Sequence, residues 1–177
     1  MARSPVRRVV ASNLIGVMSA AGPVQPAGEA LSSMVQGYQS DVTPEEAWGT
    51  LSRDPAAALV DVRTTAEWNY VGVPDLSALD KQLLRVEWQS FPSGATNPDF
   101  VKTLDAALKQ AGTSSEAPLF FICRSGARSA SAAAAMTAAG YAHCFNVAGG
   151  FEGPRDADGH RGTVDGWKTA KLPWAQS

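Results

Sequence analysis

The most apolar stretch of this 177-residue chain runs directly into a cysteine. Pro118–Ile122 reads Pro-Leu-Phe-Phe-Ile, which is too short for a stable helix and predicts a buried strand. A loop from Cys123 to Arg128 follows, and then an alanine-rich segment, 129–139, that predicts a helix ended by Gly140. A strand, a tight loop and a helix in this order constrain the fold strongly, because they are typical of α/β domains and place the cysteine at the carboxyl edge of a sheet.

The rest of the chain repeats the alternation of strands and helices. Thr43 and Glu46 form a capping box, with Pro44 at the first helical position, and Thr64 and Glu67 form a second capping box. The other predicted elements are strands at 57–62, 83–86 and 144–147, and an amphipathic helix capped by Asn97-Pro98 and stopped at Gly112. This pattern predicts an α/β domain over residues 41–177 with a mainly parallel central sheet.

Residues 1–40 are expected to form a flexible leader, because 20–40 are rich in Gly, Pro, Ser and Gln. Arginines precede the mildly apolar stretch 9–21, which is too short and too polar to span a bilayer. Two interpretations of this segment stay open: a weak targeting peptide, or a misassigned start, with translation beginning at Met18 so that residues 1–17 are not made. We expect a cytoplasmic protein, or an exported or organellar one if the segment is a targeting peptide.

Composition excludes several classes of function. A hydrophobic content of 45% suits one globular domain, and a net charge of −2 without a basic run argues against nucleic-acid binding. The two cysteines, Cys123 and Cys144, form no C-x-x-C pair, so a disulfide scaffold and a zinc site are not expected. Cys123 is therefore interpreted as a reactive thiol, and Cys144, in an apolar strand, as part of the core.

The residues around Cys123 favour a thiolate. Gly126 accepts a positive φ, so the loop can turn tightly and aim successive N–H groups inward as an anion cradle. The following helix adds the positive end of its dipole, and Arg124 and Arg128 add full charges. Cys123 is thus the predicted nucleophile. The predicted substrate-binding residues are Arg124, Ser125, Gly126, Ala127, Arg128 and Ser129.

Four motifs in one order resemble a single-domain rhodanese, which is a sulfurtransferase. They are Asp61-Val62-Arg63, Glu67-Trp68, the loop 123–129 and Val147-Ala148-Gly149-Gly150-Phe151. The tail, with its Gly-Phe-Glu-Gly, Gly-His-Arg-Gly and Gly-Trp-Lys stretches, is similar to that of a subgroup found in bacteria and plant chloroplasts.

The resemblance implies a five-stranded parallel sheet flanked by helices on both faces. It also implies a ping-pong cycle, in which Cys123 takes sulfane sulfur from a donor such as thiosulfate and passes it from a persulfide to cyanide, a thiol or a protein. The loop amides would hold the terminal sulfur. No metal and no organic cofactor are implied, and neither nucleic acid nor membrane is an expected partner.

The chain departs from the family pattern at two places. The family's usual Gly-His-Ile-Pro-Gly-Ala is here 71–76, Val-Gly-Val-Pro-Asp-Leu, without the histidine, and the polar insertion 154–165 has no assigned role. Asp156 to Gly159 faintly resembles a calcium loop but lacks the later ligands, so we expect an exposed turn. Candidate neighbours of the active-site mouth are His160, Arg161, Trp68 and Trp88.

Two further hypotheses compete with sulfur transfer to a small molecule. One is a binding or protein-to-protein sulfur-relay module. The other is a cysteine phosphatase or arsenate reductase, whose loops have five residues between the cysteine and the arginine, whereas four separate Cys123 from Arg128 here. Asp61 and Arg63 are predicted to support the loop, with Asp61 pairing to an arginine for which Arg128 is the named candidate.

Overall fold

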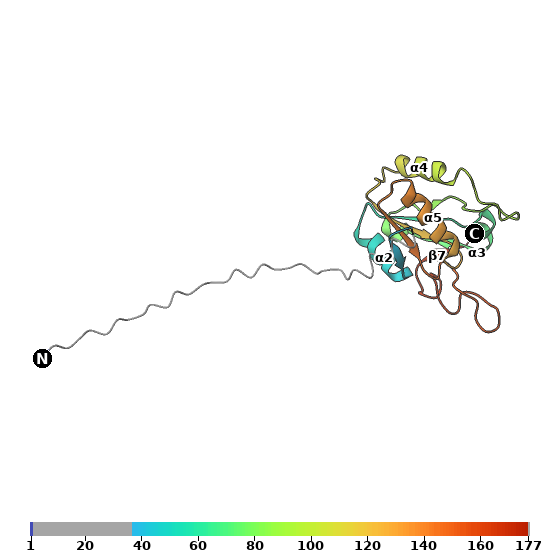
Figure 1. The fold of residues 1–177 in the computed structure, drawn as a ribbon. Helices are drawn as coiled ribbons and strands as arrows, with labels where there is room; N and C mark the ends of the chain where they lie inside the picture. The colour runs from blue at the N-terminus through green and yellow to red at the C-terminus, as the bar shows by residue number, and fades with distance from the viewer. Residues whose placement is uncertain (2–36, 177) are drawn as a thin grey trace.

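The centre of the domain is a five-stranded sheet whose strands are all parallel (Figure 1). The structure, a computed structural model, describes Met1 and residues 37–176. The strands lie in the order β1-β6-β5-β2-β4, so β5, which precedes Cys123, is the middle strand. Their bounds are β1 (Ser40–Val42), β2 (Ala58–Asp61), β4 (Leu84–Arg85), β5 (Pro118–Ile122) and β6 (His143–Val147). The predicted α/β fold with a mainly parallel sheet is confirmed.

Helices cover both faces of the sheet. Residues of α4 and α5 pack with Phe121 and Cys123, whereas residues of α2 pack with Phe120 and Ile122 on the opposite face. Successive side chains of a strand point to opposite faces, so a continuous apolar run is what a strand covered on both sides requires. The helices are α2 (Pro44–Arg53), α3 (Thr65–Val71), α4 (Phe100–Gln110) and α5 (Ala127–Ala138), with a short 3-10 helix, η1 (Ser77–Leu79).

Two of the four predicted helix starts are confirmed, and two are shifted. The side chains of Thr43 and Thr64 accept the N3 amides of α2 and α3, as capping boxes require. The prediction that Asn97 caps α4 is wrong: the N-cap is Asp99, and Asn97 instead accepts the amide of Asp99 and donates to the Glu87 carbonyl. Helix α5 begins at residue 127 rather than 129, because its N-cap is Gly126 in the left-handed region, with φ +105°.

Ordered contacts begin before the predicted end of the leader. Tyr38 is 8% exposed and packs into the α4–α5 side of the core, and the amide of Gln39 donates to the Cys144 carbonyl. Residues 2–36 of the expected leader lie outside the described residues. Strand β1 was not predicted, since its three residues carry little hydrophobic signal and their pairing with β6 is a long-range contact.

The C-terminal residues return to the domain as a second small sheet. Strands β3 (Val73–Pro74) and β7 (Trp174–Ala175) pair in antiparallel fashion, and neither was predicted. Trp167 is fully buried and packs edge-to-face against Trp48, with ring centroids 5.9 Å apart. The turn at Asp156 is exposed, as expected, and the Asp156 carboxylate accepts the amides of Asp158 and His160.

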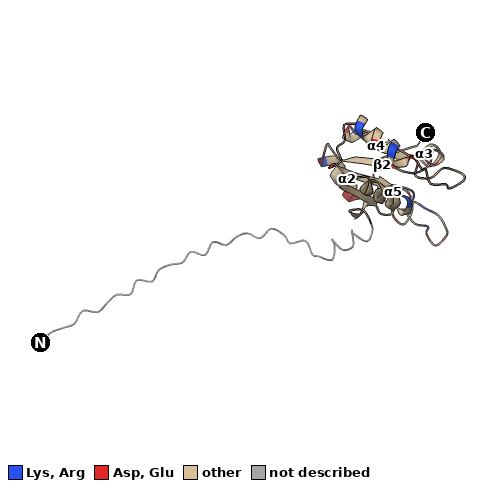
Figure 2. Cartoon of the chain, turned by 45° about the horizontal axis from the view of Figure 1, so that its top comes forward, with Lys and Arg blue, Asp and Glu red and all other residues tan. Residues whose placement is uncertain are grey.

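Charged residues are spread over several elements rather than gathered on one (Figure 2). Within residues 37–176, no helix is long and apolar enough to cross a membrane. The same part of the chain holds no group of three or more His, Cys, Asp or Glu side chains that could bind a metal ion.

Candidate active site

Cys123 lies between the end of β5 and the start of α5, at the carboxyl edge of the sheet. This is where open α/β sheets bind their ligands. The residue is 1% exposed, so its thiol is enclosed by the loop that follows it. The first amides of α5 have no acceptor within the helix, which makes this a favourable place for a negatively charged sulfur.

Two donors contact the Cys123 sulfur. The amide of Gly126 donates to Sγ at 3.1 Å, and the Ser129 hydroxyl lies 3.2 Å from the same atom. Gly126 has a positive φ, which glycine adopts readily and which lets helix α5 begin directly after this contact. The structure therefore places Gly126 and Ser129 against Cys123, with one backbone and one side-chain donor on the sulfur.

Ser129 connects the sulfur to a buried polar network. Its Oγ lies 2.7 Å from Oδ1 of Asn146, and Nδ2 of Asn146 donates to Asp41 at 2.8 Å. The Tyr38 hydroxyl also donates to Asp41, at 2.8 Å. Burial, together with the hydrogen bond to Asp41, raises the pKa of Tyr38 to about 12, so the phenol remains a donor at neutral pH. Asn146 had no predicted role, although a polar residue inside an apolar strand was the available signal.

The segment after β6 holds the back of the cysteine loop. The amide of Phe151 donates to the Cys123 carbonyl at 2.8 Å, and that of Glu152 donates to the Arg124 carbonyl at 2.9 Å. A Cβ on Gly150 would lie 2.5 Å from the Cys123 carbonyl oxygen, so this close approach needs glycine. Because these carbonyls are bonded to the 150–153 segment, the loop is held in one shape.

Arg128 pairs with Glu67 on α3. Its Nη1 and Nη2 donate to the Glu67 carboxylate at 2.8 and 2.6 Å, and both side chains are less than one-fifth exposed. Burial alone would raise the pKa of Glu67, but the hydrogen bond from Arg128 and those from Thr64 outweigh it and lower the pKa to about 2. Thr64 is the capping partner that the sequence predicts for Glu67, and its second partner, Arg128, was not predicted.

Asp61 pairs with Arg63, so the predicted pairing with Arg128 is wrong. Arg63 Nη2 donates to Asp61 at 2.6 Å and to the Gly72 carbonyl at 2.7 Å, and both charged side chains are fully buried. The Arg63 guanidinium also stacks on Phe151, 4.1 Å from the ring centroid. The Arg63 side chain turns back to a carboxylate two residues earlier in the chain, whereas Arg128 forms its ion pair with Glu67. The ion pair thus contacts Phe151, whose amide bonds the Cys123 carbonyl, and a loop-supporting role for Asp61 and Arg63 stays a prediction.

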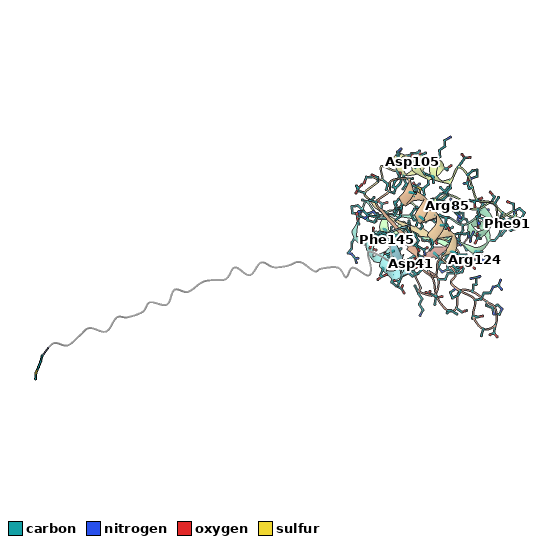
Figure 3. All side chains as sticks on the ribbon, in the orientation of Figure 1. Asp41, Arg85, Phe91, Asp105, Arg124 and Phe145 are labelled. Atoms are coloured by element: carbon teal, nitrogen blue, oxygen red, sulfur yellow. The ribbon has the colours of Figure 1, made fainter. Side chains whose placement is uncertain are left out.

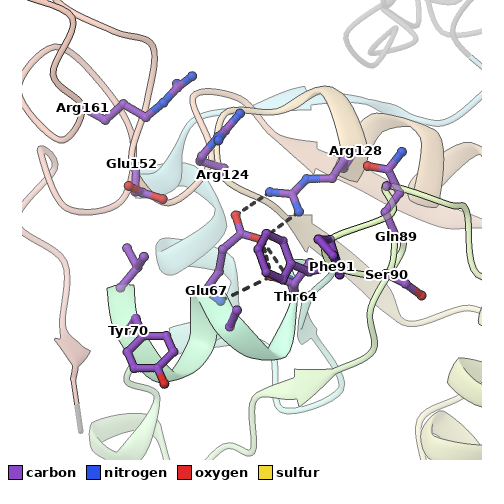
Figure 4. Close-up of a pocket in the computed structure, with 14 residues that line it drawn as sticks. Thr64, Glu67, Tyr70, Gln89, Ser90, Phe91, Arg124, Arg128, Glu152 and Arg161 are labelled. Carbon is purple, nitrogen blue, oxygen red and sulfur yellow. Dashed lines mark hydrogen bonds and ion pairs between the residues drawn. The ribbon is translucent and has the colours of Figure 1, made fainter.

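A cavity of about 580 Å³ adjoins the cysteine loop (Figure 4). Arg124 and Arg128 line it, together with residues of α3, the β4–α4 connection and the C-terminal segment. The lining residues from these other elements include Glu67, Tyr70, Phe91, Glu152 and Arg161. Of the four candidate mouth residues, only Arg161 lines the cavity: His160 is exposed, Trp68 packs under Arg85, and Trp88 packs on Phe100.

The remaining cysteine is part of the core. Cys144 is fully buried on β6, and burial raises the pKa of its thiol to about 11. It is therefore a neutral thiol at physiological pH, in agreement with its interpretation as a core residue.

In Figure 3, Asp41 and Phe145 on the β1–β6 side lie apart from Arg124 and Phe91, which mark the cavity side.

The sheet order, the flanking helices and the cysteine loop define a rhodanese-like domain. The chain belongs to the STR4 middle-domain family, whose model matches residues 39–177. It is 37% identical over 134 residues to "Uncharacterized protein RP600 homolog" of Rickettsia rickettsii, covering 76% of this chain and 95% of that protein. It is also 26% identical over 132 residues to the chloroplastic rhodanese-like domain-containing protein 4 of Arabidopsis thaliana, of which it covers 25%.

Two solved structures share the fold. The crystal structure of Rv0390 from M. tuberculosis matches with a TM-score of 0.70 and 46% identity, covering 79% of this chain and 99% of that one. The solution structure of a polysulfide-sulfur transferase homodimer from Wolinella succinogenes matches with a TM-score of 0.50 and 21% identity, over 85% and 89% of the two chains. These likenesses agree with the rhodanese-like architecture.

Proposed function

We propose that this protein is a sulfurtransferase that moves sulfane sulfur from a donor such as thiosulfate to a thiophilic acceptor through a persulfide on Cys123. The observation that carries the proposal is the pair of donors on the Cys123 sulfur, the Gly126 amide and the Ser129 hydroxyl. Hydrogen bonds to an anionic sulfur stabilise it, and the same loop can hold the negative terminal sulfur of a persulfide. The substrate-binding residues are proposed to be 124–129.

The proposed cycle has two substitutions at sulfur. The Cys123 thiolate attacks the outer sulfur of thiosulfate, so that an Sγ–S bond forms, the bond to the sulfonate sulfur breaks and sulfite leaves with the bonding electrons. An acceptor nucleophile then attacks the terminal sulfur and regenerates the thiolate; cyanide gives thiocyanate. In each step the attacking nucleophile supplies the electron pair of the new bond, first the Cys123 thiolate and then the acceptor, and the leaving sulfite or Cys123 thiolate takes the pair of the broken bond, so the cycle balances with neither a metal nor an organic cofactor.

The engagement of Arg128 supports sulfur rather than phosphate as the cargo. A phosphatase arginine needs free guanidinium donors to hold an oxyanion bidentately. Here Nη1 and Nη2 of Arg128 both donate to Glu67, and only four residues separate Cys123 from Arg128. A compact loop whose arginine is already neutralised by a carboxylate suits a single sulfur atom better than a tetrahedral oxyanion.

Mass spectrometry of the intact protein tests the proposal. Incubation with thiosulfate should add the mass of one sulfur atom, cyanide should remove it, and the Cys123→Ser variant should remain unloaded. Loading only by a persulfide-carrying protein would favour the relay module, and turnover of an aryl phosphate without sulfur uptake would favour the phosphatase. An unloaded wild-type protein with every donor would overturn the sulfurtransferase proposal.

Finer assignments of subgroup, substrates and location belong to the same proposal. Matches to bacterial and plant-chloroplast proteins support the bacterial and plant-chloroplast-like subgroup. We propose a small sulfur-containing anion as the donor, a thiol or a protein as the acceptor, and the cytoplasm as the location. Fractionation of cells that produce the natural protein, with detection by antibody, tests the location.

A further inference from the structure

The cavity beside the cysteine loop is much larger than thiosulfate requires. Its volume of about 580 Å³ lies in the range of pockets that bind organic ligands. Tyr70 and Phe91 line it while remaining 80% and 72% exposed, which is unusual for large aromatic side chains. Space and aromatic surface at this position favour a substrate with a carbon skeleton.

The charges of the cavity wall favour an anion. Five ionised side chains line it, and Arg128 and Glu67 neutralise each other as an ion pair. The remaining charges are two arginines, Arg124 and Arg161, against one carboxylate, Glu152. The wall is therefore positive although the whole chain has a net charge of −2, and a concave surface of one sign attracts ligands of the other.

Arg124 and Arg161 both have guanidinium N–H donors that could bind a ligand. Among residues 37–176, neither Arg124 nor Arg161 forms an ion pair with a carboxylate, whereas Arg63 and Arg128 do. A guanidinium carries five N–H donors, and Arg161 uses Nη1 for the Gly153 carbonyl. That bond leaves other donors available and anchors the side chain at the cavity.

Arg161 comes from the insertion 154–165, whose fold is supported by its own hydrogen bonds. The Gly162 amide donates to the Glu152 carbonyl, and the Thr163 hydroxyl donates to the Asp156 carboxylate. Figure 4 shows Arg161, Arg124 and Glu152 gathered at one side of the cavity. The insertion thus adds a cation beside the loop that carries Cys123, at a distance from the sulfur-binding amides.

We propose that Arg161, together with Arg124, forms a subsite for a carboxylate that the sulfur donor or acceptor carries away from its reacting sulfur. The preferred substrates are then anionic organic thiols or persulfides rather than neutral thiols of equal size. This inference rests on the proposed function of Cys123, but it concerns recognition rather than the transfer step. Arg161 acts here as a specificity residue, because it contacts the substrate and not the reacting atoms.

A protection experiment tests recognition without requiring turnover. Alkylation of Cys123 by iodoacetamide is timed in the presence of methylthiosuccinate, a dianionic thioether that cannot exchange sulfur, or of methylthioglycerol, its neutral counterpart. The dianion should slow alkylation at concentrations where the neutral compound does not. The Arg161→Gln variant should raise the half-protecting concentration about fivefold, the effect of losing one exposed charge pair.

Two further variants control the experiment. Arg155→Gln removes an exposed arginine of the same insertion that does not line the cavity, and its protection should equal that of the wild type. Arg161→Lys should retain part of the protection, because the positive charge remains. Equal protection in the wild type and Arg161→Gln, or equal protection by the dianion and the neutral compound, overturns the inference.

Loading of Cys123 by thiosulfate, measured on the same samples, separates this inference from the proposed function. Protection by the dianion without sulfur loading supports the subsite and counts against the sulfurtransferase. Loading without preferential protection supports the sulfurtransferase and overturns the subsite. In turnover assays, the ratio of kcat/KM for mercaptosuccinate to that for thioglycerol should fall about fivefold in Arg161→Gln, mainly through KM.

Discussion

The carboxylate of Glu67 on α3 receives both terminal nitrogens of Arg128 on α5, at 2.8 and 2.6 Å, across 61 residues of chain. This pair joins the helix that follows β2 to the helix that follows the cysteine, and it lines the cavity. It also leaves Nη1 and Nη2 of Arg128 occupied, so the pair acts on the active site chiefly by holding the start of α5. The catalytic loop thus depends on an interaction outside itself.

Replacing Glu67 by Gln should weaken both the fold and the reaction. The change leaves a half-buried guanidinium with a neutral partner, which should cost about 1–3 kcal/mol of unfolding free energy. Sulfur loading of Cys123 should slow because α5 and the loop lose an anchor. Urea unfolding and timed thiosulfate loading measure the two effects. Glu116→Gln, an exposed change, is the control; equal behaviour of the two variants would contradict the anchoring role.

The contribution of Glu67 should depend on pH in a defined direction. Its pKa is lowered from 4.5 to about 2 in the folded protein, so the unfolded chain takes up the proton first as the pH falls. The stability that this carboxylate supplies is therefore full above about pH 5 and is lost as the pH falls through its folded-state value. The stability difference between wild type and Glu67→Gln should be constant from pH 7 to 5 and should shrink at lower pH. A stability difference between wild type and Glu67→Gln that stays the same at the lowest pH measured would contradict this pH dependence.

Ser129→Ala should slow the chemistry of Cys123 more than it destabilises the fold. A hydroxyl has one proton, and Ser129 can direct it to Asn146 at 2.7 Å, to the Gly126 carbonyl at 3.0 Å or to the sulfur at 3.2 Å. Without it the thiolate loses a donor, so alkylation at pH 7 should slow about tenfold, as expected for one hydrogen bond to an ion. Ser131→Ala, an exposed change on the same helix, is the control; matching alkylation rates would exclude the donor role.

Asp61→Asn should destabilise the protein strongly. The substitution leaves the Arg63 guanidinium, which is 0% exposed, without its counter-charge, a change that costs about 3–5 kcal/mol. Replacing Asp61 by Leu and Arg63 by Met together should restore part of the lost unfolding free energy, because two apolar side chains leave no buried charge without a counter-charge. Thermal and urea unfolding measure both variants, and an unchanged midpoint in Asp61→Asn would be incompatible with a structural ion pair.

The two cysteines should react very differently in the folded protein. Burial raises the pKa of the Cys144 thiol to about 11, so at pH 8 almost none of it is thiolate. Iodoacetamide should therefore modify Cys123 alone, and unfolding in urea should expose Cys144 to the reagent. Peptide mapping by mass spectrometry distinguishes the two sites. Modification of Cys144 at a similar rate in the folded protein would contradict its place in the core.

The local features of this fold could be predicted because they depend on neighbouring residues. Thr43 and Thr64 cap helices through residues three positions away, and the apolar run of β5 requires cover on both faces wherever it lies. The position of Cys123 between a strand and a helix follows from the same local order. These elements, in their order, were sufficient to indicate a parallel α/β sheet with a nucleophile at its edge.

Long-range partners were decided by the tertiary structure alone. Nothing near Arg128 in sequence indicates that Glu67 rather than Asp61 is its partner, because the choice depends on how α3 and α5 pack. The short strands β1, β3 and β7 likewise exist only through pairing with distant segments. By itself, the sequence indicated the main helices and strands, their order and the candidate nucleophile. Tertiary packing selected the charge partners, linked Asn146 to Ser129 and brought Arg161 to the cavity, since these contacts join residues that only the folded chain brings together.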